Sequence, residues 1–324
     1  MNLSPRVQKE FVGARQRETG FLPEGMRIGT AANHRAMLSE FALRDAAAEG
    51  KTLESRVLLC DSAHDLHVDL GCMKGVIPRE EGAVGIDTGA VRDIALISRV
   101  GKPVCFRVIG FEPDGQGNVR AVLSRKAVQE DCLTKLVDTL TPGDVLSARI
   151  THLEQFGVFA DIGAGLSALM PIDSISVSRI PHPSVRFAPG QDIRAVVKGI
   201  DPLQRVTLTH KELLGTWEQN AEEFEAGQTV PGVVRSVERY GIFVELAPNL
   251  AGLAEYTDGV TPGQGASVYI KSVLPERMKI KLIIVDTFDA PQLPQPMRYY
   301  TECEHMDRWV YSPDCCDKVI ETVF

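Results

Sequence analysis

The sequence lacks the features that would place the protein in a membrane or outside the cell. Its 324 residues contain no run close to the roughly 18 consecutive apolar residues that a membrane helix needs. Residues 1–20, MNLSPRVQKEFVGARQRETG, have no apolar segment typical of a secretion signal. The 7 cysteines are an odd number and scattered, which favours reduced and mostly buried thiols over a disulfide framework. We therefore expect a cytoplasmic protein that has no membrane partner.

The sequence also lacks recognisable catalytic motifs. It has no nucleophile elbow, phosphate loop or dinucleotide fingerprint, and its 7 histidines form no His-Glu-x-x-His pattern. These absences predict a protein that is not an enzyme and that has no cofactor and no small-molecule substrate.

One C-terminal stretch is a weak candidate for a metal site. The segment CEHMDRWVYSPDCC contains thiolate and imidazole groups, which are zinc ligands, at Cys303, His305, Cys315 and Cys316. Structural zinc sites usually space their cysteines by about two to four residues, so adjacent cysteines fit poorly. The competing hypothesis is a small capping element, in which Trp309, Tyr311 and the segment VIETVF pack on the preceding domain.

An excess of basic residues is absent as well. The 35 Lys and Arg residues against 43 Asp and Glu residues give a net charge of −8, unlike the simplest nucleic-acid-binding proteins. The acids are concentrated in residues 216–226 and 287–324, which together account for the whole net charge. The remainder is close to neutral and could present a basic stripe on one face.

What the sequence does contain is an internal repeat. Residues 143–171, GDVLSARITHLEQFGVFADIGAGLSALMP, align without a gap to residues 227–255, GQTVPGVVRSVERYGIFVELAPNLAGLAE. The segment PGQDIRAVVKGID (189–201) then aligns with PGQGASVYIKSVL (262–274). A weaker copy starts at residue 50. Each unit shows short alternating runs punctuated by Gly or Pro, which indicates about five strands in roughly 70 residues.

A small closed barrel of the OB type suits this length and strand number, because closure removes exposed sheet edges. A sandwich would need about seven strands and does not fit. Between the units, runs rich in Ala, Leu and Glu predict helices. We therefore predict a mainly β protein of three tandem five-stranded OB-fold barrels joined by short helices. The expected segments are an N-terminal helical arm (1–48), a degenerate repeat (49–127), a helical linker (128–141), a second repeat (142–213), an acidic helical linker (214–225), a third repeat (226–286) and a small C-terminal tail (287–324), which opens with the extended connector DAPQLPQPM.

The repeated stretches EQFGVF and ERYGIF suggest a ligand surface. Phe156 and Phe159, like Tyr240 and Phe243, are three residues apart, so a regular strand would point them to opposite faces. A glycine inside a strand often marks a bulge, which would bring both rings to one outer face. There they could stack on unpaired bases. The alternative is that these rings are core residues.

Basic residues on or beside the expected strands could neutralise phosphates next to the rings. The candidates are Arg149, Lys198 and Arg205 in the second repeat and Arg235, Arg239, Lys271 and Lys279 in the third. Ordinary solvated surface charge is the alternative for each of them, although Arg205 and Lys279 recur at matching positions.

This pattern resembles the RNA-binding repeat of the bacterial ribosomal protein S-one family, with three copies over roughly residues 49–286. The resemblance implies that two aromatics, a histidine and an acid–base pair on the barrel contact RNA. The aromatics fall on Phe156, Phe159, Tyr240 and Phe243, and the acid and base fall on Asp201 and Arg205. The third repeat keeps only the base, as Lys279, with Leu274 at the acid position. The family histidine is replaced by Pro171 and Glu255, and the first repeat has His64 and His67 at the aromatic positions.

The resemblance therefore implies a protein that binds single-stranded RNA, including mRNA, in translation at the small ribosomal subunit. The first repeat would serve in docking to a protein partner. Two alternatives remain open. One is a docking scaffold on a ribosome, RNA polymerase or nuclease that does not grip RNA, and the other is an accessory subunit of an RNA-degrading enzyme.

Overall fold

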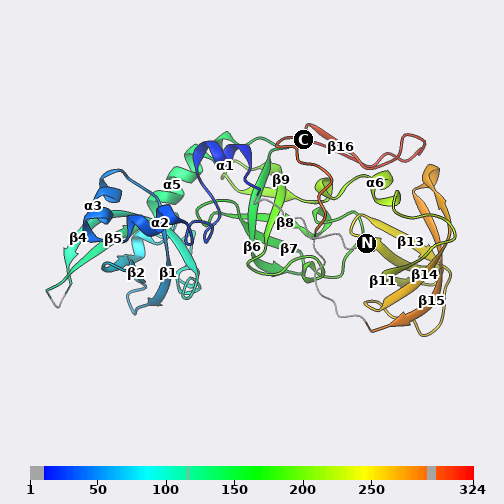
Figure 1. The fold of residues 1–324 in the computed structure, drawn as a ribbon, viewed down its shortest axis with the longest axis horizontal. Helices are drawn as coiled ribbons and strands as arrows, with labels where there is room; N and C mark the ends of the chain where they lie inside the picture. The colour runs from blue at the N-terminus through cyan, green and yellow to red at the C-terminus, as the bar shows by residue number, and fades with distance from the viewer. Residues whose placement is uncertain (1–10, 115–116, 290–296) are drawn as a thin grey trace. The chain divides into compact units, whose positions relative to one another are not determined.

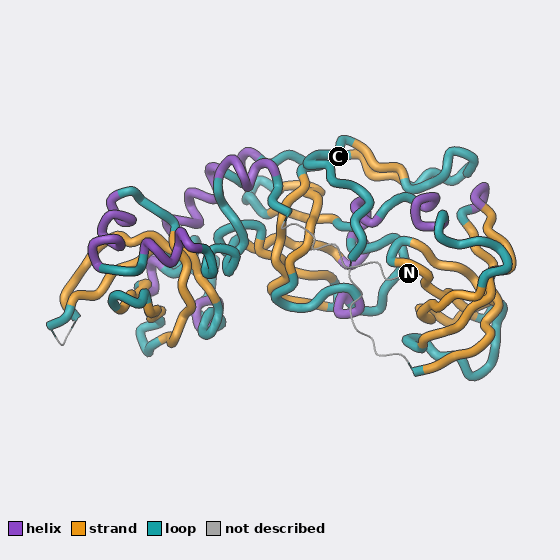
Figure 2. The backbone as a smooth tube through the Cα atoms, viewed as in Figure 1, coloured by secondary structure: helices purple, strands orange, loops and turns teal. Residues whose placement is uncertain are grey.

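The computed structural model describes residues 11–114, 117–289 and 297–324, and it confirms the predicted fold class. Strands dominate and form three closed barrels of five strands each (Figures 1 and 2). The chain divides into two compact units. The first comprises Met1–Leu140, Ser147–Arg149 and Asp161–Ser167, and the second comprises Thr141–Leu146, Ile150–Ala160 and Ala168–Phe324. Within the described ranges, no helix has both the length and the apolar character to cross a membrane.

The three barrels share one topology. The strands of the first barrel are β1 (Leu53–Cys60), β2 (Leu66–Asp69), β3 (Lys74–Ile77), β4 (Pro103–Pro113) and β5 (Val119–Ser124). Those of the middle barrel are β6 (Val145–Glu154), β7 (Gly157–Asp161), β8 (Ser167–Pro171), β9 (Asp192–Ile200) and β10 (Val206–Thr209). Those of the last barrel are β11 (Thr229–Glu238), β12 (Gly241–Ala247), β13 (Leu250–Ala254), β14 (Gly265–Leu274) and β15 (Lys279–Phe288). In each barrel the third and fifth strands pair in parallel, which closes the Greek-key order first, second, third, fifth, fourth.

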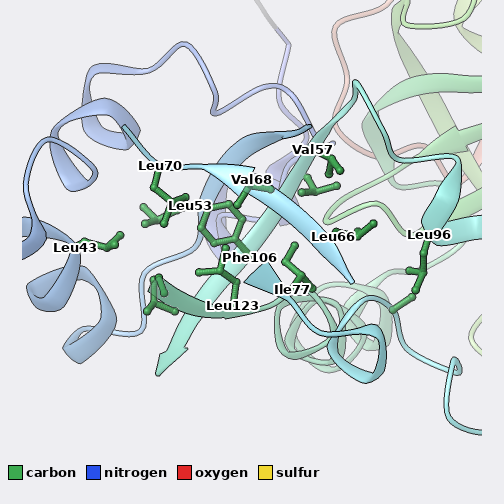
Figure 3. Packing of buried hydrophobic residues seen from close by; sticks show 14 of the residues in the cluster. Leu43, Leu53, Val57, Leu66, Val68, Leu70, Ile77, Leu96, Phe106 and Leu123 are labelled. Carbon is green, nitrogen blue, oxygen red and sulfur yellow. The ribbon is translucent and has the colours of Figure 1, made fainter. Parts of the chain in front are cut away.

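Alternation along the strands builds each core. In the first barrel, Phe106 on β4 is fully buried and is surrounded by aliphatic side chains from the other strands (Figure 3). Leu53 on β1 pairs directly with Phe106, and Leu123 comes from β5. Because apolar residues alternate with polar ones, one face of every strand fills the barrel while the other remains available at its surface.

The predicted helices form in shorter pieces than their composition suggests. Residues 31–48 fold as α2 (Ala31–Ala36) and α3 (Glu40–Ala48), because Ser39 accepts a hydrogen bond from the Ala42 N–H and starts a new helix. The helical linker predicted over 128–141 is α5 (Lys126–Lys135) followed by a short 3-10 turn. In the segment 211–227, Gly215 adopts φ +84° and separates a 3-10 turn from α6 (Trp217–Ala221). The remaining α-helices among the described residues are α1 (Ala14–Thr19) and α4 (Ile94–Ile97).

In the first unit, the segment after α1 is fixed by a buried ionic network. Glu24 is 4% exposed, and its carboxylate accepts hydrogen bonds from Arg125 Nε at 2.7 Å, Arg99 Nη1 at 3.1 Å and the Cys105 N–H at 3.1 Å. The Glu24 N–H donates to Asp161 Oδ2 at 2.7 Å. Burial alone would raise the pKa of Glu24, but the charges of Arg125 and Arg99 hold it below its ordinary value.

Glu54 lies beside this network and shows the opposite shift. Its Oε2 accepts the backbone N–H groups of Gly25, Arg27 and Ile28, at 3.1, 2.9 and 2.9 Å. Burial of the carboxylate outweighs these bonds and raises the pKa of Glu54 to about 7. Burial likewise raises the pKa of Asp161 to about 6.

These two carboxyl groups predict a pH dependence of stability. A folded-state pKa above the unfolded value means that the folded chain holds protons that the unfolded chain has lost between about pH 4.5 and 7. The free energy of unfolding of the first unit should therefore fall as the pH rises from 5 to 8, by about 1–3 kcal/mol. Urea unfolding across this range would measure it. Glu54→Gln should flatten the profile, and a profile of unchanged slope in that variant would contradict the assignment.

The C-terminal segment packs within the second unit. Its strands β16 (Arg308–Val310) and β17 (Glu321–Val323) form a hairpin, and Trp309 and Tyr311 join the buried core of the last barrel. Tyr299 lies against His210, with ring centroids 5.6 Å apart. This arrangement agrees with the capping element of the sequence prediction. Most of the predicted connector DAPQLPQPM lies outside the described residues.

Candidate nucleic-acid interface

The two repeated aromatic stretches form tight turns. Phe156 occupies the two-residue turn between β6 and β7, and Tyr240 occupies the equivalent turn between β11 and β12. Gly157 and Gly241 are the first residues of the strands that follow, so the predicted bulge at these glycines does not form. The register shift in β11 lies instead between Val234 and Ser236. The ring before each glycine therefore projects from a turn and does not follow strand alternation.

The glycines are required by close backbone packing. Gly157 has φ +157° and Gly241 has φ +150°, and a Cβ at either position would overlap the backbone carbonyl oxygen of Met170 or Ala254. A side chain at either glycine cannot be accommodated unless the neighbouring strand, β8 or β13, moves away. Glycine at this point thus keeps the turn short and holds the preceding ring at the end of the barrel.

In each of these two barrels, the two rings lie next to each other. Phe156 is 56% exposed and contacts Phe159 edge-to-face, with centroids 6.1 Å apart and planes at 85°. Tyr240 is 71% exposed and contacts Phe243 in the same way, at 6.2 Å and 86°. The barrel cores are filled by other residues, among them Val158 and Ile242. The aromatic pairs are therefore surface features of both barrels, and we call them the ring pairs.

The charged groups of the middle barrel considered for RNA binding lie on β9 and in the turn between β9 and β10. Lys198 is the extra residue in a register shift between β9 and β10, and its Nζ is 3.1 Å from Ser174 Oγ. Arg205 Nε donates to Asp201 Oδ2 at 2.6 Å, while Asp201 Oδ1 accepts the backbone N–H groups of Leu203 and Arg205, both at 2.9 Å. Asp201 thus shapes the β9–β10 turn and orients an exposed guanidinium at the same time.

The last barrel presents lysines across a continuous row of its outer face. Phe243 on β12 pairs with Leu253 on β13, which pairs with Lys281 on β15. Lys271 on β14 is the extra residue of a register shift, matching Lys198, and it lies 3.9 Å from the carboxylate of Glu255. Lys279 and Lys281 share a face because they alternate with the buried Ile280. Sequence reasoning missed Lys281, although the alternation in KIKLII could have identified it.

Two arginines that the sequence predicted to contact RNA form hydrogen bonds within the protein instead. Arg149 Nη1 donates to the carbonyl oxygen of Glu24 at 2.9 Å, within the first unit. Arg235 forms two hydrogen bonds with the buried Glu245, both at 2.9 Å, and Arg186 approaches the same carboxylate at 2.5 Å. These contacts favour structural roles for Arg149 and Arg235, and we do not include them in the proposed interface.

The first barrel differs at the matching positions. His67 occupies the register position of Phe243, and its Nε2 is 2.8 Å from Asp61 Oδ2. His64 has φ +65° in a longer turn, and its Nδ1 is 3.8 Å from Asp93 Oδ2. On β4, Ile109 is the extra residue of the register shift where the other barrels have lysine. This face thus has neither a ring pair nor the lysine.

The weak zinc candidates are not assembled into a site. Within the ranges that the structure describes, no three His, Cys, Asp or Glu side chains form a group that could hold a metal ion. His305 Nδ1 lies 2.8 Å from Asp144 Oδ1, where the C-terminal segment runs beside the middle barrel. Cys315 is exposed, while Cys303 and Cys316 are half-buried free thiols.

Comparisons with known proteins identify proteins to which this chain is similar. Residues 139–211 match the family model of the S1 RNA binding domain. The small ribosomal subunit protein bS1 of Staphylococcus aureus (strain MRSA252) is 29% identical over 263 residues, covering 75% of this chain and 64% of that protein. The bS1 protein of Staphylococcus haemolyticus (strain JCSC1435) is 29% identical over 239 residues, covering 68% and 58%. The chain thus matches somewhat less than two thirds of the length of these relatives.

A solved multidomain protein with nucleic acid binding domains, from Streptococcus pneumoniae, is 14% identical to the chain. The match covers 73% of this chain and 74% of that protein. Its TM-score is 0.24, which is too low to support a structural conclusion. The family match and the bS1 relatives confirm the resemblance that the repeats predicted. Residues 139–211, which include the middle barrel, thus match the S1 RNA binding domain, and the chain is similar to the bS1 small ribosomal subunit proteins.

Proposed function

We propose that the chain is a non-enzymatic protein that binds single-stranded RNA through the middle and last barrels. The recurrence of the same exposed ring pair, at 6.1 and 6.2 Å, supports the proposal most strongly. Two independent barrels keep rings at a surface where burial would be the usual fate of an aromatic side chain. Each base stacked on such a ring contributes about 1–3 kcal/mol without regard to base identity.

The charges around the ring pairs suit the same ligand. Lys198 and Arg205 lie on the middle barrel, and Lys271, Lys279 and Lys281 lie on the last. Each cation can neutralise one phosphate and release its counterions. The net charge of −8 does not oppose this, because the acidic residues are concentrated in residues 216–226 and in the C-terminal segment.

The relatives extend the proposal to translation. Because these relatives are small ribosomal subunit proteins, we propose that this chain holds mRNA at that subunit. The first barrel would contribute a protein contact. Its His64 and His67 face carboxylates, while Leu59, Ile94 and Ile109 expose aliphatic side chains. We propose that the three domains with these roles are residues 49–127, 142–213 and 226–286.

Competition binding tests the RNA proposal. A labelled, unstructured RNA of about 16 nucleotides, the upper site size of one OB fold, should bind the full chain. Unlabelled single strands of different sequence should compete equally well, while an RNA duplex of the same length should compete at least about tenfold less, because its bases are stacked on one another. No binding to the single strand would favour the alternative of a docking scaffold without an RNA grip.

A further inference from the structure

The outer face of the β14–β15 strand pair carries an apolar and cationic strip. On β15, Lys279, Lys281, Ile283 and Val285 are exposed and alternate along the strand, and Asp286 and Phe288 are exposed near its end. On β14, Tyr269 and Lys271 are exposed on either side of the buried Ile270. We call Tyr269, Lys271, Lys279, Lys281 and Ile283 the β15 strip. An exposed apolar strip of this kind on a closed barrel usually marks a binding surface.

The strand register connects this strip to the ring pair of the same barrel. Lys281 pairs with Leu253, which pairs with Phe243, so the lysine continues the row that starts at the rings. Tyr269 pairs directly with Ile283, two residues further along β15. Neighbouring strands are about 4.8 Å apart and alternate residues about 6.7 Å apart. The strip is thus a continuation of the proposed interface across β15 and β14.

The positive charge of the strip indicates which class of ligand it can bind. In the part of the chain that the structure describes, neither Lys279 nor Lys281 forms an ion pair, and Lys271 has only the 3.9 Å contact with Glu255. The acidic residue on β15 is Asp286, and its Oδ1 accepts a hydrogen bond from the Thr287 N–H. Three lysines beside an exposed ring and aliphatic groups complement a flexible polyanion that also has apolar faces.

We propose that Tyr269 is an additional base-stacking position, and that the β15 strip extends the RNA surface of the last barrel by at least one nucleotide. This inference rests on the proposed function. Tyr269 is 38% exposed, so part of its ring is anchored while the remainder is available. Tyr269 has no equivalent in the middle barrel, where Val196 occupies the aligned position and is fully buried. The last barrel therefore contacts more nucleotides of the RNA than the middle barrel does.

Substitution of Tyr269 tests this position. In the full chain, Tyr269→Ala should weaken binding to an unstructured RNA of about 16 nucleotides by at least about fivefold. Tyr269→Phe should bind like the wild type, because stacking needs the ring and not the hydroxyl group. Phe41→Ala is the matched control, since Phe41 is an exposed ring on α3 of the first unit and should leave the dissociation constant unchanged.

Two further variants distinguish a loss of RNA contacts from a loss of folding stability and from binding to another ligand. Tyr269→Leu keeps most of the apolar volume but has no π face, so it should weaken RNA binding even if Tyr269→Ala lowers the melting temperature. Lys281→Gln should reduce the dependence of log K on log salt by about 0.7, the value for one phosphate contact on a single strand.

The outcomes separate this inference from the proposed function. If Tyr269→Leu and Lys281→Gln bind RNA like the wild type while Tyr240→Ala binds weakly, the strip is not an RNA surface and a protein partner becomes the better interpretation. If the wild type itself does not bind the RNA, the proposed function fails together with the strip.

Discussion

Replacing Arg125 with methionine should destabilise the first unit by about 3–5 kcal/mol. The substitution removes the guanidinium that donates to Glu24 at 2.7 and 3.1 Å and leaves that carboxylate buried with less compensation. Arg99 remains nearby, but it provides a single contact at 3.1 Å. Methionine retains the apolar stem of the side chain, so the effect should come from the uncompensated charge and not from a cavity.

Urea unfolding of the full chain would measure this effect. Arg120→Met is the matched control, because Arg120 forms a partly exposed ion pair with Glu112 and should change stability by no more than about 1 kcal/mol. The double variant Glu24→Gln, Arg125→Met should be more stable than Arg125→Met alone, since it removes the buried charge as well as its partner. A cost below about 1 kcal/mol for Arg125→Met would show that the network is not a buried ion pair of this kind.

Replacing both Phe156 and Tyr240 with alanine should weaken binding to unstructured RNA by more than about tenfold. Each substitution removes the exposed ring of one pair while the inner ring, Phe159 or Phe243, remains on its strand. Because both rings lie in surface turns, the loss should appear in the dissociation constant and not in the melting temperature. Fluorescence anisotropy with a labelled RNA at fixed salt would measure it.

The single variants provide the internal control for this prediction. If each barrel binds part of one strand, Phe156→Ala and Tyr240→Ala should each account for a share of the loss. Phe41→Ala should again have no effect. An unchanged dissociation constant for the double variant would exclude the ring pairs from RNA binding.

The repeat made much of the fold and the ring pairs predictable. Local patterns are set by neighbouring residues: alternation in the strands recurs in all three repeats, and the aromatic-glycine pair recurs in the second and third. The turn at Gly157 and Gly241 was not predictable, because a glycine before a strand and a glycine inside one look alike in sequence. The structural reason for glycine is the carbonyl group of another strand.

Residues whose roles depend on distant partners could not be assigned from sequence. Arg235 resembled a surface base, but its partner Glu245 and the neighbouring Arg186 come together only in the folded second unit. Arg149 and the Glu24 network depend on contacts more than 70 residues apart along the chain. Lys281 and Tyr269 were missed for another reason, since neither belongs to the motif shared by the repeats.

The measurement that tests the central claim most directly is the salt dependence of RNA binding by the full chain. Five cations lie on the proposed faces, namely Lys198, Arg205, Lys271, Lys279 and Lys281. If each neutralises one phosphate of a single strand, log K should fall against log salt with a slope of about −3.5, which is about a hundredfold loss between roughly 50 and 200 mM salt. A dissociation constant that is measurable but independent of salt, or no binding at the lower concentration, would contradict the account.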